Sequence, residues 1–160
     1  MSYPQEQTYP TPTPTEPPLW APFYGANPFQ AVKRFFAKYA TFTGRASRSE
    51  YWWWNLASTV IGIVLVALYL GLGFIGATAS ADGTMVPGPG ALLGGALLAI
   101  FSLGTIIPSL AVAVRRLHDA NLSGWLLLLA LMPFFGGATI LVLTLLGPNP
   151  AGQRFDRPTV

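Results

Sequence analysis

The chain has 160 residues, of which 52% are hydrophobic and only 9% are charged, whereas an ordinary soluble domain carries roughly 25% charged residues. This deficit argues against a soluble globular protein and indicates an integral membrane protein. With no cysteine and a single histidine, we expect no disulfide, no metal site and no cofactor. The net charge of +3 comes from basic residues clustered beside apolar runs, which is typical of topology signals and makes nucleic acid a poor candidate partner.

The segment 1–27 is rich in proline and has no basic residue. It holds seven prolines, including the alternating Pro and Thr of residues 10–15. Such a composition cannot build a packed core and favours extended polyproline II conformations. We therefore expect a disordered Pro/Thr-rich tail. The segment also lacks a basic start followed by an apolar stretch and a cleavage site, so we expect the first membrane helix to serve as its own signal.

Residues 28–40 show the pattern of an amphipathic helix. Asn27 is a good N-cap residue, and Pro28 suits the first helical position. Aromatic and basic residues separate onto opposite sides at 100° per residue, as expected for a helix that lies in the membrane interface. The alternative is that the aromatic stripe packs against the protein's own membrane helices. The aromatic side comprises Phe29, Val32, Phe35, Phe36 and Tyr39, and the basic side comprises Lys33, Arg34 and Lys38.

Three uncharged apolar runs follow, and each exceeds the ~20 residues needed to cross a bilayer. We expect membrane spans at about 51–76, 91–114 and 124–146. The turn-rich residues 77–90 form a short loop between the first two spans, and residues 147–160 form a polar tail. Aromatic residues near the starts of the first and third spans are predicted to be interfacial anchors; they are Trp52, Trp53, Trp54 and Trp125.

The second span carries two local features. Gly90 and Gly94 have the spacing of small residues that lets two membrane helices approach closely. Pro108 has no backbone N–H, so the carbonyl near Gly104 loses its normal partner and a kink is expected. Nearby hydroxyl groups could bond the freed backbone groups; they belong to Ser102, Thr105 and Ser109.

The third apolar run is compatible with two geometries, because Pro133, Gly136 and Gly137 interrupt it. We favour a single kinked helix because its length matches a span. The alternative is a re-entrant hairpin. Three full crossings place seven basic residues on the cytoplasmic side and two outside, whereas a hairpin places all nine on one side, so the charge rule favours the hairpin. Both geometries place the N-terminus in the cytoplasm.

Three blocks of residues stand out near the ends of the predicted spans. Each combines basic residues with glycine and aromatic residues in a short stretch. They are FTGRASRSEYW at residues 42–52, RRLHD at residues 115–119 followed by Ser123-Gly124-Trp125, and GPNPAGQRFD at residues 147–156.

The order and spacing of these blocks resemble the small bacterial inner-membrane proteins catalogued as domain of unknown function 805. The resemblance covers about residues 29–158. The first two blocks match at nearly every position, whereas the third has Gln153 and Asp156 where Asn and Gly are usual in the family. The resemblance implies a multi-pass protein of the bacterial plasma membrane and no established biochemical role.

Arginines of the first two blocks meet at one membrane face in either geometry. Asp119 lies three and four residues after two of them and can pair with either on a helix. The interpretation that we favour is structural: ion pairs and snorkelled arginines fix helix ends and orientation. The functional alternative is an anion site, because Arg suits bidentate phosphate recognition, and Arg154 joins it if the third run re-enters. The four arginines are Arg45, Arg48, Arg115 and Arg116.

Catalysis and ion-coupled transport find little support in the sequence. His118 beside Asp119 suggests a general base, but adjacent residues on one helix point in different directions, so we expect a satisfied interfacial His. The predicted spans hold no ionisable residue, which argues against a proton-coupled pump.

We therefore expect an all-α integral membrane protein with three transmembrane helices, the third kinked or re-entrant. Its expected role is non-enzymatic, that of a membrane-organising or interaction subunit whose basic cytoplasmic face contacts anionic lipid headgroups, other membrane proteins or further copies of the chain. The alternative is a transport or channel component that acts as an oligomer, and a membrane-embedded enzyme is less favoured.

Overall fold

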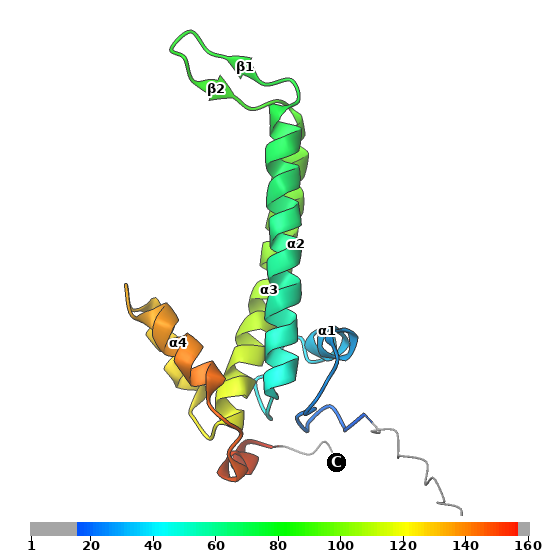
Figure 1. Ribbon diagram of the computed structural model, residues 1–160, viewed down its shortest axis with the longest axis vertical. Helices are drawn as coiled ribbons and strands as arrows, with labels where there is room; N and C mark the ends of the chain where they lie inside the picture. Colours follow the sequence, from blue (N-terminus) through cyan, green and yellow to red (C-terminus); the bar gives the residue numbers. More distant parts are fainter. Residues whose placement is uncertain (1–15, 157–160) are drawn as a thin grey trace, which may run out of the picture.

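The computed structural model describes residues 16–156, which are mostly helical (Figure 1). Two long helices run side by side, and the short elements gather near one end of this pair, apart from a small hairpin at the other end. The elements in chain order are α1 (Pro28–Ala37), α2 (Arg48–Phe74), β1 (Thr78–Ala79), β2 (Met85–Val86), α3 (Gly90–Asp119), η1 (Gly124–Leu131), α4 (Gly136–Leu145) and η2 (Pro150–Phe155).

Helices α2 and α3 are both long and apolar enough to cross a membrane. They contain 27 and 30 residues, so at about 1.5 Å per residue each exceeds the roughly 30 Å hydrocarbon core. Most of their large apolar side chains are exposed, as expected for lipid-facing surfaces. The predicted spans 51–76 and 91–114 correspond to these helices, and the predicted loop 77–90 contains the two-residue strands β1 and β2, paired antiparallel.

Glycine allows α2 and α3 to approach closely. A Cβ atom added at Gly94 would lie 2.6 Å from Cα of Tyr69, and one added at Gly90 would lie 2.6 Å from the carbonyl oxygen of Leu72. Real Cβ atoms essentially never come this near to backbone, so a larger residue at either position forces the helices apart. The predicted close approach through this glycine pair is confirmed.

Pro108 leaves the Gly104 carbonyl of α3 without its usual helical donor, and a residue outside α3 replaces that donor. The hydroxyl of Tyr39, just after α1, donates to the Gly104 oxygen at 2.7 Å. The predicted orphaned carbonyl is therefore present, and its new hydrogen bond joins the segment after α1 to the middle of α3. Of the hydroxyls proposed from the sequence, Thr105 bonds Phe101 and Ser102 carbonyls, and Ser109 accepts from Trp54.

The third apolar run is not one kinked helix, and the geometry that we favoured from its length is wrong. It forms η1, turns at residues 132–135 and returns as α4. Gly136 lies so close to the backbone of η1 that a side chain there would collide with it, which explains why a small residue stands at the turn. Figure 1 shows α4 folded back beside η1. Neither piece is long enough to cross a hydrocarbon core by itself.

The segment preceding α1 differs from its prediction. Residues 1–15 lie outside the described residues, but residues 16–27 fold against the charged end of α2 and α3 instead of remaining disordered. Phe23 and Ala26 are buried, and the N–H of Ala26 donates to the Ser49 hydroxyl at 3.1 Å. We call residues 16–26 the N-terminal strap.

Helix α1 begins as the sequence predicts. Asn27 caps it in a capping box, accepting from the Gln30 N–H and donating to the Gln30 side chain. Its two sides divide differently: Phe35 stacks on Trp54 with ring centroids 3.4 Å apart, whereas Phe29 and Phe36 are exposed. The alternative interpretation, packing against the protein's own helices, is confirmed for Phe35, and the interfacial position of the exposed aromatic residues stays a prediction.

Candidate functional site

All six residues predicted to form an anion or partner site lie at one end of the molecule. The turn at residues 132–135 returns the chain to this end, where the Asn149 N–H donates to the Asp119 carbonyl and the Gly44 N–H donates to the Phe155 carbonyl. The three sequence blocks therefore pack against one another. The six residues are Arg45, Arg48, Arg115, Arg116, Asp119 and Arg154.

Four of the charged residues at this end form a balanced cluster of two cations and two carboxylates. Arg45 makes a bidentate contact with Asp156, through Nε to Oδ1 at 3.0 Å and Nη2 to Oδ2 at 2.7 Å. Arg116 Nη1 donates to Asp119 Oδ2 at 2.7 Å, and Arg45 Nη1 lies 3.8 Å from Asp119 Oδ1. We call Arg45, Arg116, Asp119 and Asp156 the balanced cluster. The hydrogen bond that Arg45 donates to Asp156 raises the pKa of the Arg45 guanidinium.

The N-terminal strap completes this cluster. The Tyr24 hydroxyl donates to Asp119 Oδ1 at 2.6 Å. Burial and the neighbouring carboxylate both raise the pKa of Tyr24, so the phenol stays protonated and remains a donor. Asp119 is fully buried and receives partners from both α3 and the strap, which a buried carboxylate requires.

Arg48 and Arg116 hold the end of α4. The last carbonyls of a helix have no partner within the helix. Arg48 Nε and Nη2 donate to the Leu146 and Leu145 carbonyls at 3.1 and 2.6 Å, and Arg116 donates to the carbonyls of Thr144 and Leu146. Guanidinium groups from α2 and α3 thus fix the point to which the third apolar run returns.

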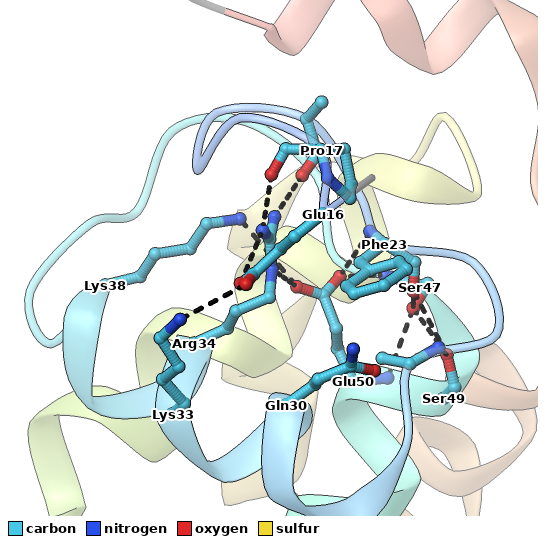
Figure 2. A network of polar contacts seen from close by, with 12 residues as sticks. Glu16, Pro17, Phe23, Gln30, Lys33, Arg34, Lys38, Ser47, Ser49 and Glu50 are labelled. Atoms are coloured by element: carbon cyan, nitrogen blue, oxygen red, sulfur yellow. Dashed lines mark hydrogen bonds and ion pairs between the residues drawn. The ribbon is translucent and has the colours of Figure 1, made fainter. Parts of the chain in front are cut away.

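The other buried charges surround Glu50 (Figure 2). Arg34 Nε donates to Glu50 Oε1 at 2.7 Å, while the N–H groups of Phe23 and Ser47 donate to Oε2 at 3.1 and 2.9 Å. The outer nitrogens of Arg34 donate to strap carbonyls; these belong to Pro17, Pro18 and Ala21. One carboxylate therefore joins α1, α2 and the strap.

Lys38 and Arg115 are the remaining cations near Glu50. Lys38 is 4% exposed and Arg115 is 2% exposed. The nearest carboxylate oxygen to Lys38 Nζ is Glu50 Oε1 at 3.9 Å, which is too long for a hydrogen bond, and Nζ has no hydrogen-bond partner among residues 16–156. Burial lowers the pKa of Lys38 to about 7 despite the opposing pull of Glu50. We call Arg34, Lys38, Glu50 and Arg115 the Glu50 cluster.

The sequence pattern places the three basic residues of α1 together on the side opposite the aromatic residues. In the structure this basic side does not face solvent as a whole. Arg34 and Lys38 are buried in the Glu50 cluster, and only Lys33 is exposed, where it pairs with Glu16 at 3.2 Å. From the sequence, Asp119 could pair with Arg115 or with Arg116. In the structure it pairs with Arg116. Among the described residues, the Arg115 side chain donates a hydrogen bond only to the Ala111 carbonyl of its own helix.

His118 and Arg154 occupy the interface between α3 and the third block. The imidazole of His118 stacks on Phe155 with centroids 4.0 Å apart, and its Nδ1 lies 3.1 Å from the Gly44 carbonyl. Arg154 lies over the Phe155 ring at 4.6 Å and remains exposed. His118 is engaged by packing and by backbone, as an interfacial His is expected to be.

The predicted aromatic anchors divide into two groups. Trp53 and Trp125 are exposed and Trp52 is half-buried, consistent with positions at a membrane interface. Trp54 is 2% exposed, stacks on Phe35 and donates through Nε1 to the Ser109 hydroxyl at 3.3 Å. Trp54 is therefore a core residue between α1, α2 and α3, and its assignment as an anchor is wrong.

Several residues of the site were not singled out from the sequence. The pattern Ser47-x-x-Glu50 signals a capping box, which the structure contains at the start of α2, and this pattern could have predicted a fixed Glu50 side chain. Tyr24 and Lys38 carry no comparable local signal. Their roles depend on contacts with residues far away in the chain.

The apolar helices and the charged end define an integral membrane protein. The chain belongs to the family described as protein of unknown function (DUF805), whose model matches residues 39–157, and the resemblance inferred from the three blocks is confirmed. Inner membrane protein YhaI of Escherichia coli strain K12 is 35% identical over 104 residues, covering 65% of this chain and 73% of the relative. Inner membrane protein YhaH of the same strain is 34% identical over 117 residues, covering 73% and 85%.

The two relatives are inner membrane proteins by name, which supports the same location for this chain. No solved structure matches the chain.

Proposed function

We propose that the chain is a non-enzymatic subunit of the bacterial inner membrane whose charged end faces the cytoplasm and contacts anionic lipid. The observation that carries this proposal is the uneven distribution of charge. Eight described cations lie at the charged end with four carboxylates, whereas the β1–β2 loop at the other end holds Asp82 and no cation. Cytoplasmic segments of membrane proteins carry such an excess of Lys and Arg.

The proposed topology has two crossings, α2 and α3, and a re-entrant hairpin of η1 and α4. The hairpin places the third block on the cytoplasmic side together with the first two. Its polar backbone groups at the turn need partners, and η1 and α3 pack against α4 from within the chain. This topology agrees with the charge count, because all nine basic residues then lie on one side.

Contact with anionic lipid is supported by exposed groups at the charged end. Arg48 and Arg154 are exposed, and neither pairs with a carboxylate among residues 16–156. Helix α1 lies at the same end (Figure 1), and its Phe29 and Phe36 are exposed. Aromatic side chains in the headgroup region and cations near an anionic leaflet together favour membrane binding, at roughly 1 kcal/mol per cation.

Sidedness is the first test of the proposal. The chain has no native cysteine, so single cysteines can be labelled with an impermeant maleimide in spheroplasts. Ala151 and Ala81 are suitable exposed positions, whereas a side chain at Gly152 would collide with the His118 carbonyl. We expect labelling of the Ala81→Cys variant and protection of the Ala151→Cys variant until the membrane is opened. Labelling of both in sealed spheroplasts contradicts the hairpin.

Lipid analysis is the second test. Protein purified in a mild neutral detergent should retain phosphatidylglycerol or cardiolipin at a higher fraction than the membrane from which it came. The Arg154→Gln variant should retain two- to fivefold less, and Arg48 is left unchanged because it holds the end of α4. Retained lipid with the composition of the bulk membrane contradicts a specific contact with anionic lipid.

A second candidate function, transport by an oligomer, is favoured by one cavity. It has a volume of about 330 Å³, lies between α2 and α3, and includes Asn55, Ser58 and Ser109 among its lining residues. Polar groups at this depth suit a hydrophilic solute. Solute flux in reconstituted vesicles that falls in an Asn55→Leu variant supports transport, and its absence at all solutes tested favours the lipid-contact subunit.

A further inference from the structure

The Glu50 cluster has more positive charge than its own carboxylate can balance. Arg34, Lys38 and Arg115 are each at least 96% buried, and Glu50 is the buried carboxylate among them. Arg34 already occupies Glu50 Oε1, and backbone N–H groups occupy Oε2. The partly exposed Glu16 contributes to Arg34 alone, with Oε1 3.7 Å from Nη1. Burying a charge without a partner is costly, so the excess positive charge calls for an anion that the chain itself does not provide within residues 16–156.

Lys38 and Arg115 are the two groups that such an anion can use. The strap carbonyls hold Arg34, whereas Lys38 Nζ has no hydrogen-bond partner in the described part of the chain. The side chain of Arg115 bonds only the Ala111 carbonyl of its own helix there, at 3.2 Å. Figure 2 shows the Lys38 side chain directed toward Arg34 and Glu50.

The position of these groups suits a phosphoryl group. Arg115 directly follows the uncharged run that ends at Val114, so it lies where the apolar part of α3 meets the polar part, near the level of lipid phosphates. A guanidinium presents a planar set of donors that matches phosphate oxygens, and an ammonium adds a compact charge. Three cations against the carboxylates of Glu50 and Glu16 leave one positive charge in excess among the described residues, which matches the single negative charge of a phosphodiester.

We propose that Lys38 and Arg115 form a binding site for a phosphoryl oxyanion, supplied by the headgroup of an anionic phospholipid at the cytoplasmic leaflet. The inference deepens the proposed function and rests on it only for the lipid as the source, because the same two groups can hold free phosphate. It moves the anion site away from Arg45, Arg48 and Arg116, whose guanidinium groups bond carboxylates and carbonyls of the chain itself.

Anion binding and protonation of Lys38 are coupled. Burial lowers the pKa of Lys38 to about 7 without an anion. An anion beside Nζ favours the charged form, so binding raises this pKa, and affinity in turn falls as the pH rises above 7. The coupling gives the site a spectroscopic signature that a purely structural lysine does not have.

Titration with defined ligands tests the site on the full chain in neutral detergent. The ligands are dioctanoyl phosphatidylglycerol, dioctanoylglycerol, which lacks phosphate, and inorganic phosphate. We expect phosphatidylglycerol to bind at least tenfold more weakly to the Lys38→Met variant than to the wild type. Lys33→Met is the matched control, because Lys33 lies on the same helix, is exposed and pairs with Glu16; its affinity should stay within threefold.

Lysine NMR gives an independent readout. Lys33 and Lys38 are the only lysines of the chain, so [13C]lysine labelling yields two Cε signals, and Lys33→Met assigns them. Phosphatidylglycerol should raise the pKa reported by Lys38 by at least one pH unit and leave that of Lys33 unchanged. The Lys38→Met variant removes a buried unpaired charge and should fold, which its size-exclusion profile checks.

The outcomes separate the inference from the proposed function. Unchanged affinity in Lys38→Met with tight wild-type binding overturns this site and leaves the proposed lipid contact standing. Equal binding of dioctanoylglycerol also overturns the site. Inorganic phosphate that binds and shifts Lys38 while phosphatidylglycerol does not bind supports the oxyanion site and overturns the lipid contact. No binding of either anion by the wild type overturns both.

Discussion

Two charge clusters lie at the same end of this protein and are built from the same residue types, but they differ in balance. In the balanced cluster, Arg45 and Arg116 face Asp119 and Asp156 at hydrogen-bonding distances. In the Glu50 cluster, three buried cations share one buried carboxylate, and the partly exposed Glu16 adds only a 3.7 Å contact with Arg34. A buried ion pair is tolerated when each charge has its partner. The difference indicates that the balanced cluster serves the fold, whereas the Glu50 cluster has an excess of positive charge among the described residues, which the proposed anion would neutralise.

The clusters also differ in what they connect. The balanced cluster joins the first, second and third sequence blocks through the side chains of Arg45, Asp119 and Asp156. The Glu50 cluster joins α1 and the strap to α2 through Arg34 and Glu50. The strap contributes to both, with Tyr24 in one and the Phe23 N–H in the other. Each of the following changes separates the two clusters experimentally.

The largest effect is expected for Glu50→Ala. The change leaves Lys38 and Arg115 without a buried carboxylate and leaves Arg34 only the 3.7 Å contact with Glu16. It also removes the acceptor of two backbone N–H groups, those of Phe23 and Ser47. We expect the free energy of unfolding to fall by about 5 kcal/mol, the upper end for breaking a buried pair. Tryptophan fluorescence during denaturant unfolding in detergent measures the loss. Asp82→Ala, in the loop at the opposite end, is the control and should cost under about 1 kcal/mol.

Asp119→Ala should have a slightly smaller effect. Arg116 loses its buried counter-charge and Tyr24 its acceptor, but Asp156 still balances Arg45. We expect a loss of about 3 kcal/mol in the same unfolding measurement. Asp82→Ala, in the loop at the opposite end, should cost less than about 1 kcal/mol. Equal losses of unfolding free energy in Asp119→Ala and Asp82→Ala would mean that hydrogen bonds to the α4 carbonyls are enough to stabilise the buried Arg116 without Asp119.

Lys38→Met should act in the opposite direction and depend on pH. The unfolded chain holds a proton on Lys38 up to its ordinary pKa of 10.5, whereas the folded chain releases it near pH 7. Above pH 7 the unfolded state therefore binds more protons, and wild-type stability rises with pH by up to roughly 1.4 kcal/mol per pH unit. Burial sets the low value, opposed by Glu50 and by distant Asp156, and supported by Arg34 and Arg115.

In the Lys38→Met variant this slope should disappear between pH 7 and 9.5. The variant should be more stable than the wild type at pH 7, and the advantage should shrink as the pH rises. Unfolding midpoints of both proteins at pH 7, 8 and 9.5, without added anion, provide the comparison. A wild type whose stability is independent of pH in this range shows that Lys38 has a counter-charge, and the imbalance between the clusters then does not exist.

Tyr24→Phe is the smallest change. It removes one hydroxyl donor from Asp119, which keeps its bond to Arg116. We expect a loss of about 1 kcal/mol in the unfolding experiment. Tyr69→Phe is the matched control, because the Tyr69 hydroxyl makes no hydrogen bond within the described residues and Tyr69 packs against Gly94, near the start of α3, whereas the clusters involve the end of α3. A loss as large as that of Asp119→Ala would instead mean that the balanced cluster depends on the Tyr24 contact from the N-terminal strap.

Local sequence signals predicted the parts of the fold that depend on neighbouring residues. Asn27 caps α1 as expected, because capping involves residues three apart. Gly94 lies at a close helix approach because only a residue without Cβ fits there. Pro108 frees the Gly104 carbonyl because it lacks an N–H, but the donor that replaces it is Tyr39, 65 positions away in sequence. The last contact has no local signal.

The candidate site followed the same rule. The sequence predicted that the arginines of the first two blocks share one end, since helix ends and charge bias fix topology. It did not predict that Arg34 and Lys38 are buried while Lys33 is exposed, because the pattern of α1 has two plausible orientations. Phe35 stacking on Trp54 selects one orientation and turns these two cations toward Glu50.

The sequence by itself determined the membrane class, the two long helices and the family, because apolar length, charge bias and short motifs are properties of consecutive residues. The tertiary structure decided the course of the third apolar run and the balance of the two clusters. Length favoured one helix, yet Arg48 and Arg116 bind the end of α4 and hold it at the charged end. Partners for buried charges and orphaned carbonyls come from distant segments, so only the folded chain reveals which cations are paired.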